Sequence, residues 1–369
     1  MSPFPEVGCA VERADDGRPG MPRCKGGILS LNPLEETGWN DLVQSQPGTS
    51  FFHSSSWAEV LHDTYGHSPH YFCAMNGSRL AGALPIMEVN SLVTGRRGVA
   101  LPFTDECRFV AEDPASAGEI LREAMDFGRK RNWKYLEIRG PGRVVGAASP
   151  SLSFLGHELP LSGQPDQVFG RFESSVRRAI RKAEAAKIQV QISQSYESLL
   201  IYYSLHCRTR KKHGLPPQSL AFFQSIFRKV LSKGRGLIAV ARHQDRPIAA
   251  AMFFHFGDRA IYKFGASDSA FQHLRGNNLV MWEAIKWYSG RGHASLNFGR
   301  TSVANDGLRR YKLGFGTAEY PIDYFKYDFR KEAFVGDRDK VVGWFNGVFR
   351  LMPTPLSRMI GRMLYRHLS

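Results

Sequence analysis

RPIAAAMFFHFGDRAIYKFGAS, residues 246–267, is the stretch that decides the fold. It contains two runs rich in apolar and aromatic residues, RPIAAAMFFHFG and RAIYKFGAS, which predict two strands that pair as a hairpin. NNLVMWEAIKWYSGRG, residues 277–292, then predicts a helix, and SLNFG predicts a short strand. This order of elements indicates an α+β fold with a mixed sheet flanked by helices.

The flanking residues extend this unit and suggest a second one. The pattern predicts further helices at 174–187, 196–212, 219–231 and 303–316 and strands at 188–193, 236–242 and 320–328. The first half has a similar order, with helices at 39–46, 54–66 and 116–131 and strands at 70–77, 78–89, 95–103 and 134–140. Asn76-Gly77 joins the first two of these strands and is a strong hairpin signal. We therefore expect a flexible tail (1–26), two tandem domains (27–163 and 164–330) and a C-terminal helical tail (331–369).

The composition is that of a globular protein with a basic surface. Hydrophobic residues make up 43% of the 369 residues and charged residues 22%, and the formal net charge is +15. This excess of cations favours an anionic partner: tRNA, a phosphorylated small molecule or an anionic membrane surface. The five cysteines lack CxxC spacing, which argues against a disulfide framework or a zinc ribbon and for a reducing cytoplasm. We find no pattern of a signal peptide, and no apolar run approaches the ~18 residues of a membrane span.

SSVRRAIRKAEAAK, residues 174–187, concentrates four cations at the start of one predicted helix. Arg177 and Arg181 are four positions apart, as are Arg178 and Lys182, so the cations stack in two pairs. Like charges at this spacing weaken a helix slightly. The stretch therefore indicates either a solvated basic face or a binding site for an anion.

Six motifs, in this order, carry a family resemblance: SVRRAIRKAEAA, HCRTRKKHGLPP, FGASD, NNLVMWEAIKW, NFGRTS and GLRRYKLGFG. Together they resemble the FemAB-like family over about residues 169–327, and LPFTDECRF (101–109) is the best match in the first half. The resemblance implies two tandem GNAT-like domains of the acyl-CoA N-acyltransferase type. It also implies transfer of an acyl or aminoacyl group to an amine of a cell-envelope precursor, in peptidoglycan or exopolysaccharide. Direct attack by the amine needs no enzyme nucleophile, in agreement with the absence of a GxSxG motif from the sequence.

The same resemblance implies site residues in the second half. It places Arg177, Arg178 and Arg181 near the substrate phosphates, which the planar fork of arginine binds well. It places Lys312, in GLRRYKLGFG, in the active cleft, where a cation can stabilise an oxyanion or hold a phosphate. A surface lysine on a basic helix is the alternative. Arg300 follows a short predicted strand and either enters the site or forms a salt bridge within the fold.

Other candidates concern the base and the co-substrate. Asp105, in LPFTDECRF, is our first choice of general base, with a turn-forming carboxylate as the alternative. Asn277 and Asn278 lie where GNAT enzymes hold the donor pyrophosphate at a helix N-terminus, although the usual Gly-rich pattern is missing. The alternative is that one of the two asparagines is only the N-cap of the helix. His213, beside RTRKK, is a candidate for the substrate cleft or an ordinary surface histidine. We expect no tightly bound cofactor and no metal, with acyl-CoA or aminoacyl-tRNA as the co-substrate.

The tail PLSRMIGRMLYRHL, residues 355–368, predicts a basic amphipathic helix. Arg358, Arg362 and Arg366 share one edge, opposite a set of apolar residues: Leu356, Ile360, Met363 and Leu364. Such a helix lies in an anionic membrane interface or packs on its own domain. We therefore expect a cytoplasmic enzyme, peripheral on the inner face of the cytoplasmic membrane. The alternative is a non-catalytic module, a degenerate GNAT fold that binds RNA or anionic lipid.

Overall fold

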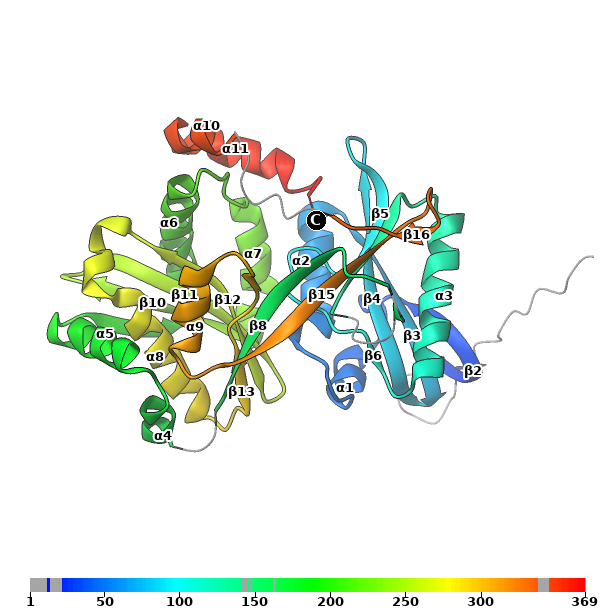
Figure 1. Ribbon diagram of the computed structural model, residues 1–369, viewed down its shortest axis with the longest axis horizontal. Helices are drawn as coiled ribbons and strands as arrows, with labels where there is room; N and C mark the ends of the chain where they lie inside the picture. The colour runs from blue at the N-terminus through cyan, green and yellow to red at the C-terminus, as the bar shows by residue number, and fades with distance from the viewer. Residues whose placement is uncertain are drawn as a thin grey trace, which may run out of the picture.

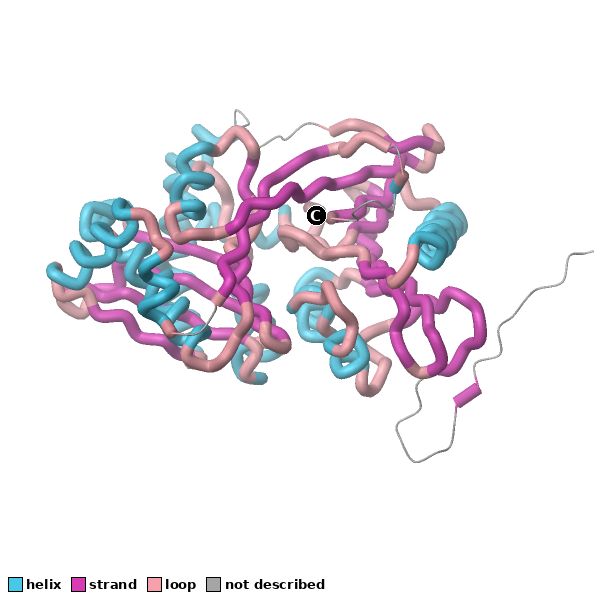
Figure 2. The backbone as a smooth tube through the Cα atoms, turned by 60° about the horizontal axis from the view of Figure 1, so that its bottom comes forward, coloured by secondary structure: helices cyan, strands magenta, loops and turns pink. Residues whose placement is uncertain are grey.

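The structure, a computed structural model, describes residues 12–13, 22–140, 145–146, 148–161, 164–337 and 345–368. Sixteen strands form one sheet that runs through two lobes, with helices on the outer faces (Figures 1 and 2). The order along the sheet is β1-β2-β3-β4-β5-β7-β15-β8-β13-β12-β11-β10-β9. Most of the expected tail, 1–26, lies outside the described residues, and β2 begins at Pro22.

The first lobe contains the three predicted helices and the four predicted strands, together with three strands and a short 3-10 helix that the sequence pattern did not predict. Its strands are β1 (Glu12–Arg13), β2 (Pro22–Leu31), β3 (Ser68–Gly77), β4 (Arg79–Ser91), β5 (Gly95–Val99), β6 (Val110–Ala111) and β7 (Tyr135–Arg139). Its helices are α1 (Trp39–Gln44), η1 (Phe51–His53), α2 (Ser55–Tyr65) and α3 (Pro114–Lys130). The hairpin between β3 and β4 is confirmed. Neighbouring residues of β3 face opposite sides: Phe72 packs in the core under α3, whereas Tyr71 packs against Trp39 of α1.

The second lobe contains the stretch that decides the fold. Its strands are β9 (Gln189–Ser193), β10 (Gly236–His243), β11 (Arg246–Phe256), β12 (Arg259–Ser267), β13 (Ser295–Asn297) and β14 (Thr301–Ser302). Its helices are α4 (Pro165–Gly170), α5 (Ser174–Ala185), α6 (Tyr196–Lys212), α7 (Leu220–Lys229), η3 (Leu231–Lys233), η4 (Ser269–Leu274), α8 (Gly276–Ser289) and α9 (Asp306–Leu313). The antiparallel pairing of β11 with β12 confirms the predicted hairpin. Phe254 faces the core under α6 and α7, and Phe253 faces the core under α8.

Two long strands join the lobes (Figure 1). β15 (Ala318–Asp328) pairs antiparallel with β7 of the first lobe and with β8 (Leu152–Pro160), and β8 continues the sheet to β13. β16 (Ala333–Phe334) pairs with the end of β15. The sequence pattern predicts β15 but not β8. Loop residues beside these strands therefore lie at the junction of the two lobes.

One hydrophobic core is shared by the two lobes. The ring centroids of Phe51 and Phe254 are 4.7 Å apart, and those of Trp57 and Phe222 are 6.0 Å apart. All four side chains are buried and come from η1, β11, α2 and α7. Because interiors are close-packed, this core holds the lobes together and gives a site at their junction fixed walls.

The C-terminal tail forms two helices, α10 (Phe345–Leu351) and α11 (Thr354–Leu364), at the upper edge of Figure 1. The Tyr365 hydroxyl, just after α11, donates a hydrogen bond to the carbonyl oxygen of Pro216 at 3.1 Å. The predicted amphipathic helix is therefore present and is attached to the second lobe. Within the described ranges no helix is long and apolar enough to cross a membrane.

Candidate active site

The loop after β5 carries the candidate base and is held in a strained conformation. Leu101 and Phe103 have positive φ angles of 54° and 62°, a backbone conformation that residues other than glycine rarely adopt. The buried guanidinium of Arg139 donates to the carbonyl oxygens of Leu101 at 3.2 Å and of Thr104 at 3.0 Å. Glu137 pairs with Arg139 at 2.7 Å. Surrounding contacts therefore fix the loop, and strain of this kind often accompanies function.

His53 of η1 holds the same loop from the first-lobe side. Its Nδ1 accepts the backbone N–H of Ser50 at 3.1 Å, so its Nε2 carries the proton that is donated to the carbonyl oxygen of Arg108 at 2.9 Å. Burial lowers the pKa of His53 to about 4, which keeps the ring neutral. Burial also raises the pKa of the neighbouring Cys107 thiol, so this Cys–His pair lacks the thiolate that a nucleophile needs.

Asp105 projects from this loop toward cations of the second lobe. Its carboxylate lies 3.3 Å from the Lys263 ammonium of β12 and 4.0 Å from the Arg300 guanidinium. Gly299 has a φ of +71°, and a Cβ atom there would lie 2.8 Å from the carboxylate of Asp105. Glycine is therefore required at this position both by the backbone conformation and by the close approach of the two lobes.

Lys312 of α9 is buried, with 2% of its surface exposed. This corrects the alternative of a surface lysine. Its ammonium donates to the carbonyl oxygens of Gly299 at 2.8 Å and Arg300 at 2.9 Å. Burial lowers the pKa of Lys312 to about 8, and Asp105 opposes this shift. Lys312 is therefore mainly cationic at neutral pH, and two of its three N–H groups are donated to backbone carbonyl oxygens.

Arg300 links Asp105 to the strand that joins the lobes. Its guanidinium lies over the ring of Phe154, 4.2 Å from the centroid, and donates to the Tyr324 hydroxyl at 2.8 Å. That hydroxyl donates in turn to the carbonyl oxygen of Asp105 at 2.5 Å. The alternative of a salt bridge within the fold is therefore confirmed for Arg300, and its entry into the site remains a prediction.

Tyr324→Phe is expected to lower the stability by about 1–3 kcal/mol, because it leaves the backbone carbonyl of Asp105 without its donor. It is also expected to lower the activity proposed below by about tenfold through misplacement of Asp105. Urea denaturation and initial rates measure the two effects. Tyr327→Phe, on the same strand, is the control, and equal losses in both variants would contradict a positioning role for Tyr324.

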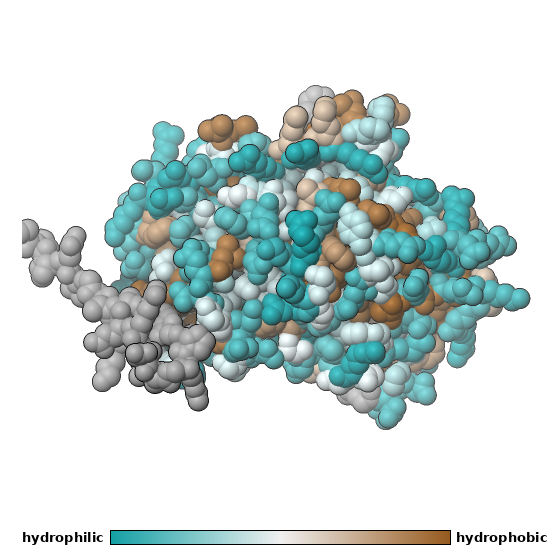
Figure 3. Space-filling view, turned by 180° about the vertical axis from the view of Figure 1, so that it is seen from behind, coloured by the Kyte–Doolittle hydropathy of each residue, from teal (hydrophilic) through white to brown (hydrophobic). Residues whose placement is uncertain are grey.

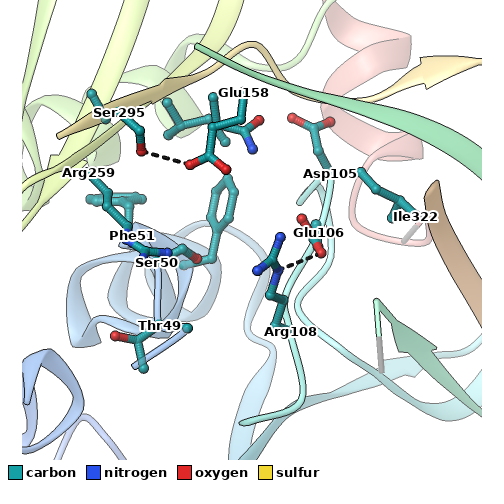
Figure 4. A pocket seen from close by; sticks show the side chains of 15 residues that line it. Thr49, Ser50, Phe51, Asp105, Glu106, Arg108, Glu158, Arg259, Ser295 and Ile322 are labelled. Carbon is teal, nitrogen blue, oxygen red and sulfur yellow. Dashed lines mark hydrogen bonds and ion pairs between the residues drawn. The ribbon is translucent and has the colours of Figure 1, made fainter. Parts of the chain in front are cut away.

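A pocket opens beside Asp105 at the junction of the lobes (Figure 4). Its lining is Gly48, Thr49, Ser50, Phe51, Phe52, Asp105, Glu106, Arg108, Glu158, Arg259, Ala260, Ile261, Ser295, Asn297 and Ile322. Glu106 accepts hydrogen bonds from Arg108 and from the Tyr320 hydroxyl, both at 2.9 Å, and Glu158 accepts one from Ser295 at 2.7 Å. The pocket therefore combines apolar walls with fixed carboxylates and two arginines, Arg108 and Arg259, of which Arg108 pairs with Glu106.

The charge around Asp105 favours an additional anion. Lys263, Arg300 and Lys312 all interact electrostatically with its single carboxylate. Burial lowers the pKa of Lys263 as it does that of Lys312, because desolvated cations that outnumber their counter-ion are destabilised. A phosphate or a developing oxyanion would relieve this excess.

The structure does not bring the basic helix into this pocket. Arg178 and Arg181 are exposed on α5, and Arg177 is half-buried there. The other face of α5 packs on α8, and none of the three is among the residues that line the pocket. His213, at the end of α6, is exposed, and its pKa is lowered by partial burial and by nearby cations that include Arg350. These four assignments remain predictions.

Asn277 and Asn278 line a separate hollow at the start of α8, together with Arg275, Gln272 and Ser267. The N-cap of α8 is Arg275, with a φ of 61°, so the N-cap alternative for the two asparagines is wrong. They lie instead in the first helical turn, where N–H groups face an incoming anion. In the described part of the chain no group of three or more His, Cys, Asp or Glu residues could hold a metal ion.

Comparisons with known proteins agree with this architecture. Residues 170–313 match the family described as "Acetyltransferase (GNAT) domain". The crystal structure of FemX is similar, with a TM-score of 0.65 and 14% identity over 83% of this chain and 98% of that chain. A tandem GNAT protein from the clavulanic acid biosynthesis pathway has a TM-score of 0.52 and 10% identity, covering 85% and 99% of the two chains.

A third similar structure is the C-terminal domain of a protein from Agrobacterium fabrum assigned as a lysylphosphatidylglycerol synthetase. Its TM-score is 0.53 at 12% identity, covering 79% of this chain and 90% of that chain. At these identities the likeness shows the fold alone. No curated protein matches the sequence.

Proposed function

We propose that this chain, which has the FemAB-like double GNAT fold, transfers an acyl or aminoacyl group from an anionic donor to an amine of a cell-envelope precursor. The observation that carries the proposal is the meeting of Asp105, from the first lobe, with Lys263, Arg300 and Lys312, from the second. Of these four residues Asp105 lines the pocket, and the three cations interact with its carboxylate from outside that lining. A carboxylate next to unneutralised cations suits a reaction in which an amine loses a proton while a carbonyl oxygen gains negative charge.

In this mechanism the acceptor amine occupies the pocket, and its nitrogen attacks the acyl carbonyl carbon of the donor. Asp105 accepts the proton that the nitrogen loses as the new C–N bond forms. The Lys312 ammonium, whose third N–H has this role in the proposal, stabilises the carbonyl oxygen as it becomes negative. The bond to the donor's sulfur or oxygen then breaks, and the leaving group takes up the proton. No covalent intermediate with the enzyme is required.

The donor is proposed to be acyl-CoA or aminoacyl-tRNA, since both carry phosphates that the basic second lobe can bind. The hollow that Asn277 and Asn278 line lies at the start of α8 and is also lined by Arg275, so a helix N-terminus and a cation are both near it. The backbone N–H of Asn278 is already donated to the carbonyl oxygen of Arg275 at 3.0 Å, so the support for phosphate binding comes from Arg275 and from the first residues of the helix. Arg177, Arg178 and Arg181 on α5 remain candidates for phosphates that lie farther from the reacting carbonyl.

The acceptor is proposed to be a phosphorylated precursor of peptidoglycan or exopolysaccharide. The likeness to FemX and to the protein assigned as a lysylphosphatidylglycerol synthetase supports acyl or aminoacyl transfer at the cell envelope. The carboxylates of Glu106 and Glu158 in the pocket support an amine as the accepting group.

Transfer assays with the purified protein test this function. Lipid-linked peptidoglycan precursor and an amino-sugar acceptor are each combined with acetyl-CoA or with a mixture of aminoacyl-tRNAs. We expect amide formation with one donor class and loss of product in Asp105→Asn. Absence of product from every combination, together with salt-sensitive binding of RNA or anionic lipid, would favour the non-catalytic module.

A further inference from the structure

α11 packs on the second lobe through its smallest residues. Ser357 and Gly361 are buried, as is Tyr365 one turn later on the same face. A Cβ atom at Gly361 would lie 2.1 Å from the carbonyl oxygen of Pro217, so only glycine allows this approach. The side of the helix that meets the protein is therefore not its apolar side.

The large apolar side chains of the tail face solvent instead. Met359 and Met363 are 51% and 63% exposed, and Leu351, the last residue of α10, is 87% exposed. Leu356, Leu364 and Leu368 are also exposed. An amphipathic helix that only covered a core would bury these residues. Their exposure in one segment marks an interaction surface.

The turn between β4 and β5 adds to this surface. Leu92 and Val93 at its tip are fully and three-quarters exposed. The tail is fastened to this turn, because His367 Nδ1 lies 2.8 Å from the Ser91 hydroxyl and the carbonyl oxygen of His367 accepts a bond from Arg97 at 2.8 Å. Figure 3 shows hydrophobic groups standing out along the upper edge, over the hairpin tip and over the tail helices.

The charges around these apolar side chains are basic. Arg350, Arg358, Arg362 and Arg366 are exposed on the tail, and the sequence has no acidic residue from 341 to 369. Arg362 and Arg366 share a hollow with Met359 and Met363, so cation and apolar side chain alternate on the outer face of α11.

We propose that the outer face of α10 and α11, together with the Leu92-Val93 tip, docks on an anionic phospholipid bilayer. The apolar side chains enter the boundary between headgroups and acyl chains, and the arginines bind lipid phosphates. The inference does not depend on the proposed transfer reaction, since it concerns a different surface and is tested without a substrate.

A bilayer fits this surface better than a second copy of the chain. The apolar side chains project singly from a helix and from a turn tip, and the shared charge is of one sign. Two copies that met face to face would bring like charges together, which destabilises an interface. An anionic surface instead complements Arg350, Arg362 and Arg366. Arg358 also donates to the Cys207 sulfur at 3.4 Å and lies over the ring of Tyr203.

The proposed docking surface contacts the loop that carries Asp105. The rings of Tyr365 and Phe103 lie 5.8 Å apart, and Phe103 stands two residues before Asp105. The docking surface and the loop that carries the candidate base therefore share a packed contact. The bilayer would meet the molecule on the side where this loop is held.

Co-sedimentation of the full chain with vesicles tests the proposal. We expect binding to vesicles of phosphatidylcholine mixed with phosphatidylglycerol, and weaker binding to phosphatidylcholine alone or at high salt. Leu92→Ser with Val93→Ser removes apolar insertion, and Arg362→Glu with Arg366→Glu reverses charge. Each pair is expected to weaken binding by at least about tenfold. All four side chains are exposed, so the fold is expected to be retained.

The matched control reverses the same number of charges elsewhere. Lys182→Glu with Lys187→Glu changes two exposed cations, one in the last turn of α5 and one just after it, to which the proposed reaction assigns no role. We expect less than about a threefold change, because distant exposed charges are screened. Equal losses in the control and the tail variants, or no binding to either vesicle, would overturn the proposal. A dimer in solution that the Leu92/Val93 variant abolishes would assign the surface to a second copy instead.

Discussion

Lys312→Met is expected to lower the rate of transfer by about 100- to 1000-fold, the effect of removing one donor to a developing oxyanion. Methionine has a similar length but no N–H group, so the carbonyl oxygen of the reacting acyl group loses its partner. The same reasoning predicts that the wild-type rate falls as the pH rises through about 8, the pKa of Lys312. Initial rates over this pH range measure both effects.

Lys312 is also expected to make the free energy of unfolding depend on pH. Its pKa is about 8 in the folded protein against an ordinary value of 10.5, so between these pH values the unfolded chain binds more protons than the folded one. Wild-type stability is therefore expected to rise through this window, by up to about 3 kcal/mol, and to rise less in Lys312→Met. Urea denaturation of both proteins at several pH values gives the difference.

Arg310→Met is the control, since Arg310 is an exposed cation on the same helix. We expect it to retain the wild-type rate and the wild-type change of stability with pH. A Lys312→Met protein that transfers at the wild-type rate would contradict the role given to this ammonium.

Asp105→Asn is expected to lower the rate of transfer by about 100-fold or more, because an amide cannot accept the proton of the attacking amine. Asparagine has the same shape, so the loop and the pocket are expected to keep their geometry. Rates at saturating donor and acceptor separate this loss from weaker binding.

The residual activity of Asp105→Asn should also shift with pH. The Asp105 carboxylate raises the pKa of Lys312 against the effect of burial, so its removal lowers that pKa below about 8. The alkaline fall in rate is therefore expected at lower pH than in the wild type. Asp323→Asn, which keeps a hydrogen bond to Ser153, is the control. An unshifted alkaline limb in Asp105→Asn would contradict the proximity of the two groups.

Local patterns in the sequence predict most of the fold. The hairpins at β3–β4 and β11–β12 have turn residues and apolar runs that act over a few positions, and both are confirmed. β8 was missed because its pairing depends on β15, far along the chain, and its own residues alternate weakly. Pairing between distant strands follows from tertiary packing, which no window of sequence contains.

The site was only partly predictable for the same reason. The family resemblance points to Asp105 and Lys312, the position after a short strand points to Arg300, and the structure brings these three together. Lys263 was missed as a partner of Asp105, although a lone lysine inside the apolar run of β12 is a signal of a buried charge. Tyr324 gives no such signal, because a tyrosine in a strand is ordinary and its contact with Asp105 crosses the lobes.

A double-mutant cycle of Asp105→Asn and Lys312→Met, measured as single-turnover transfer of the acyl group, tests the central claim most directly. If the two side chains act on one reacting carbonyl, the double variant is expected to be about as slow as the slower single variant, because groups that act as a unit are not additive. Losses that multiply would show that the residues act independently, and wild-type rates in all three variants would show that the reaction occurs elsewhere.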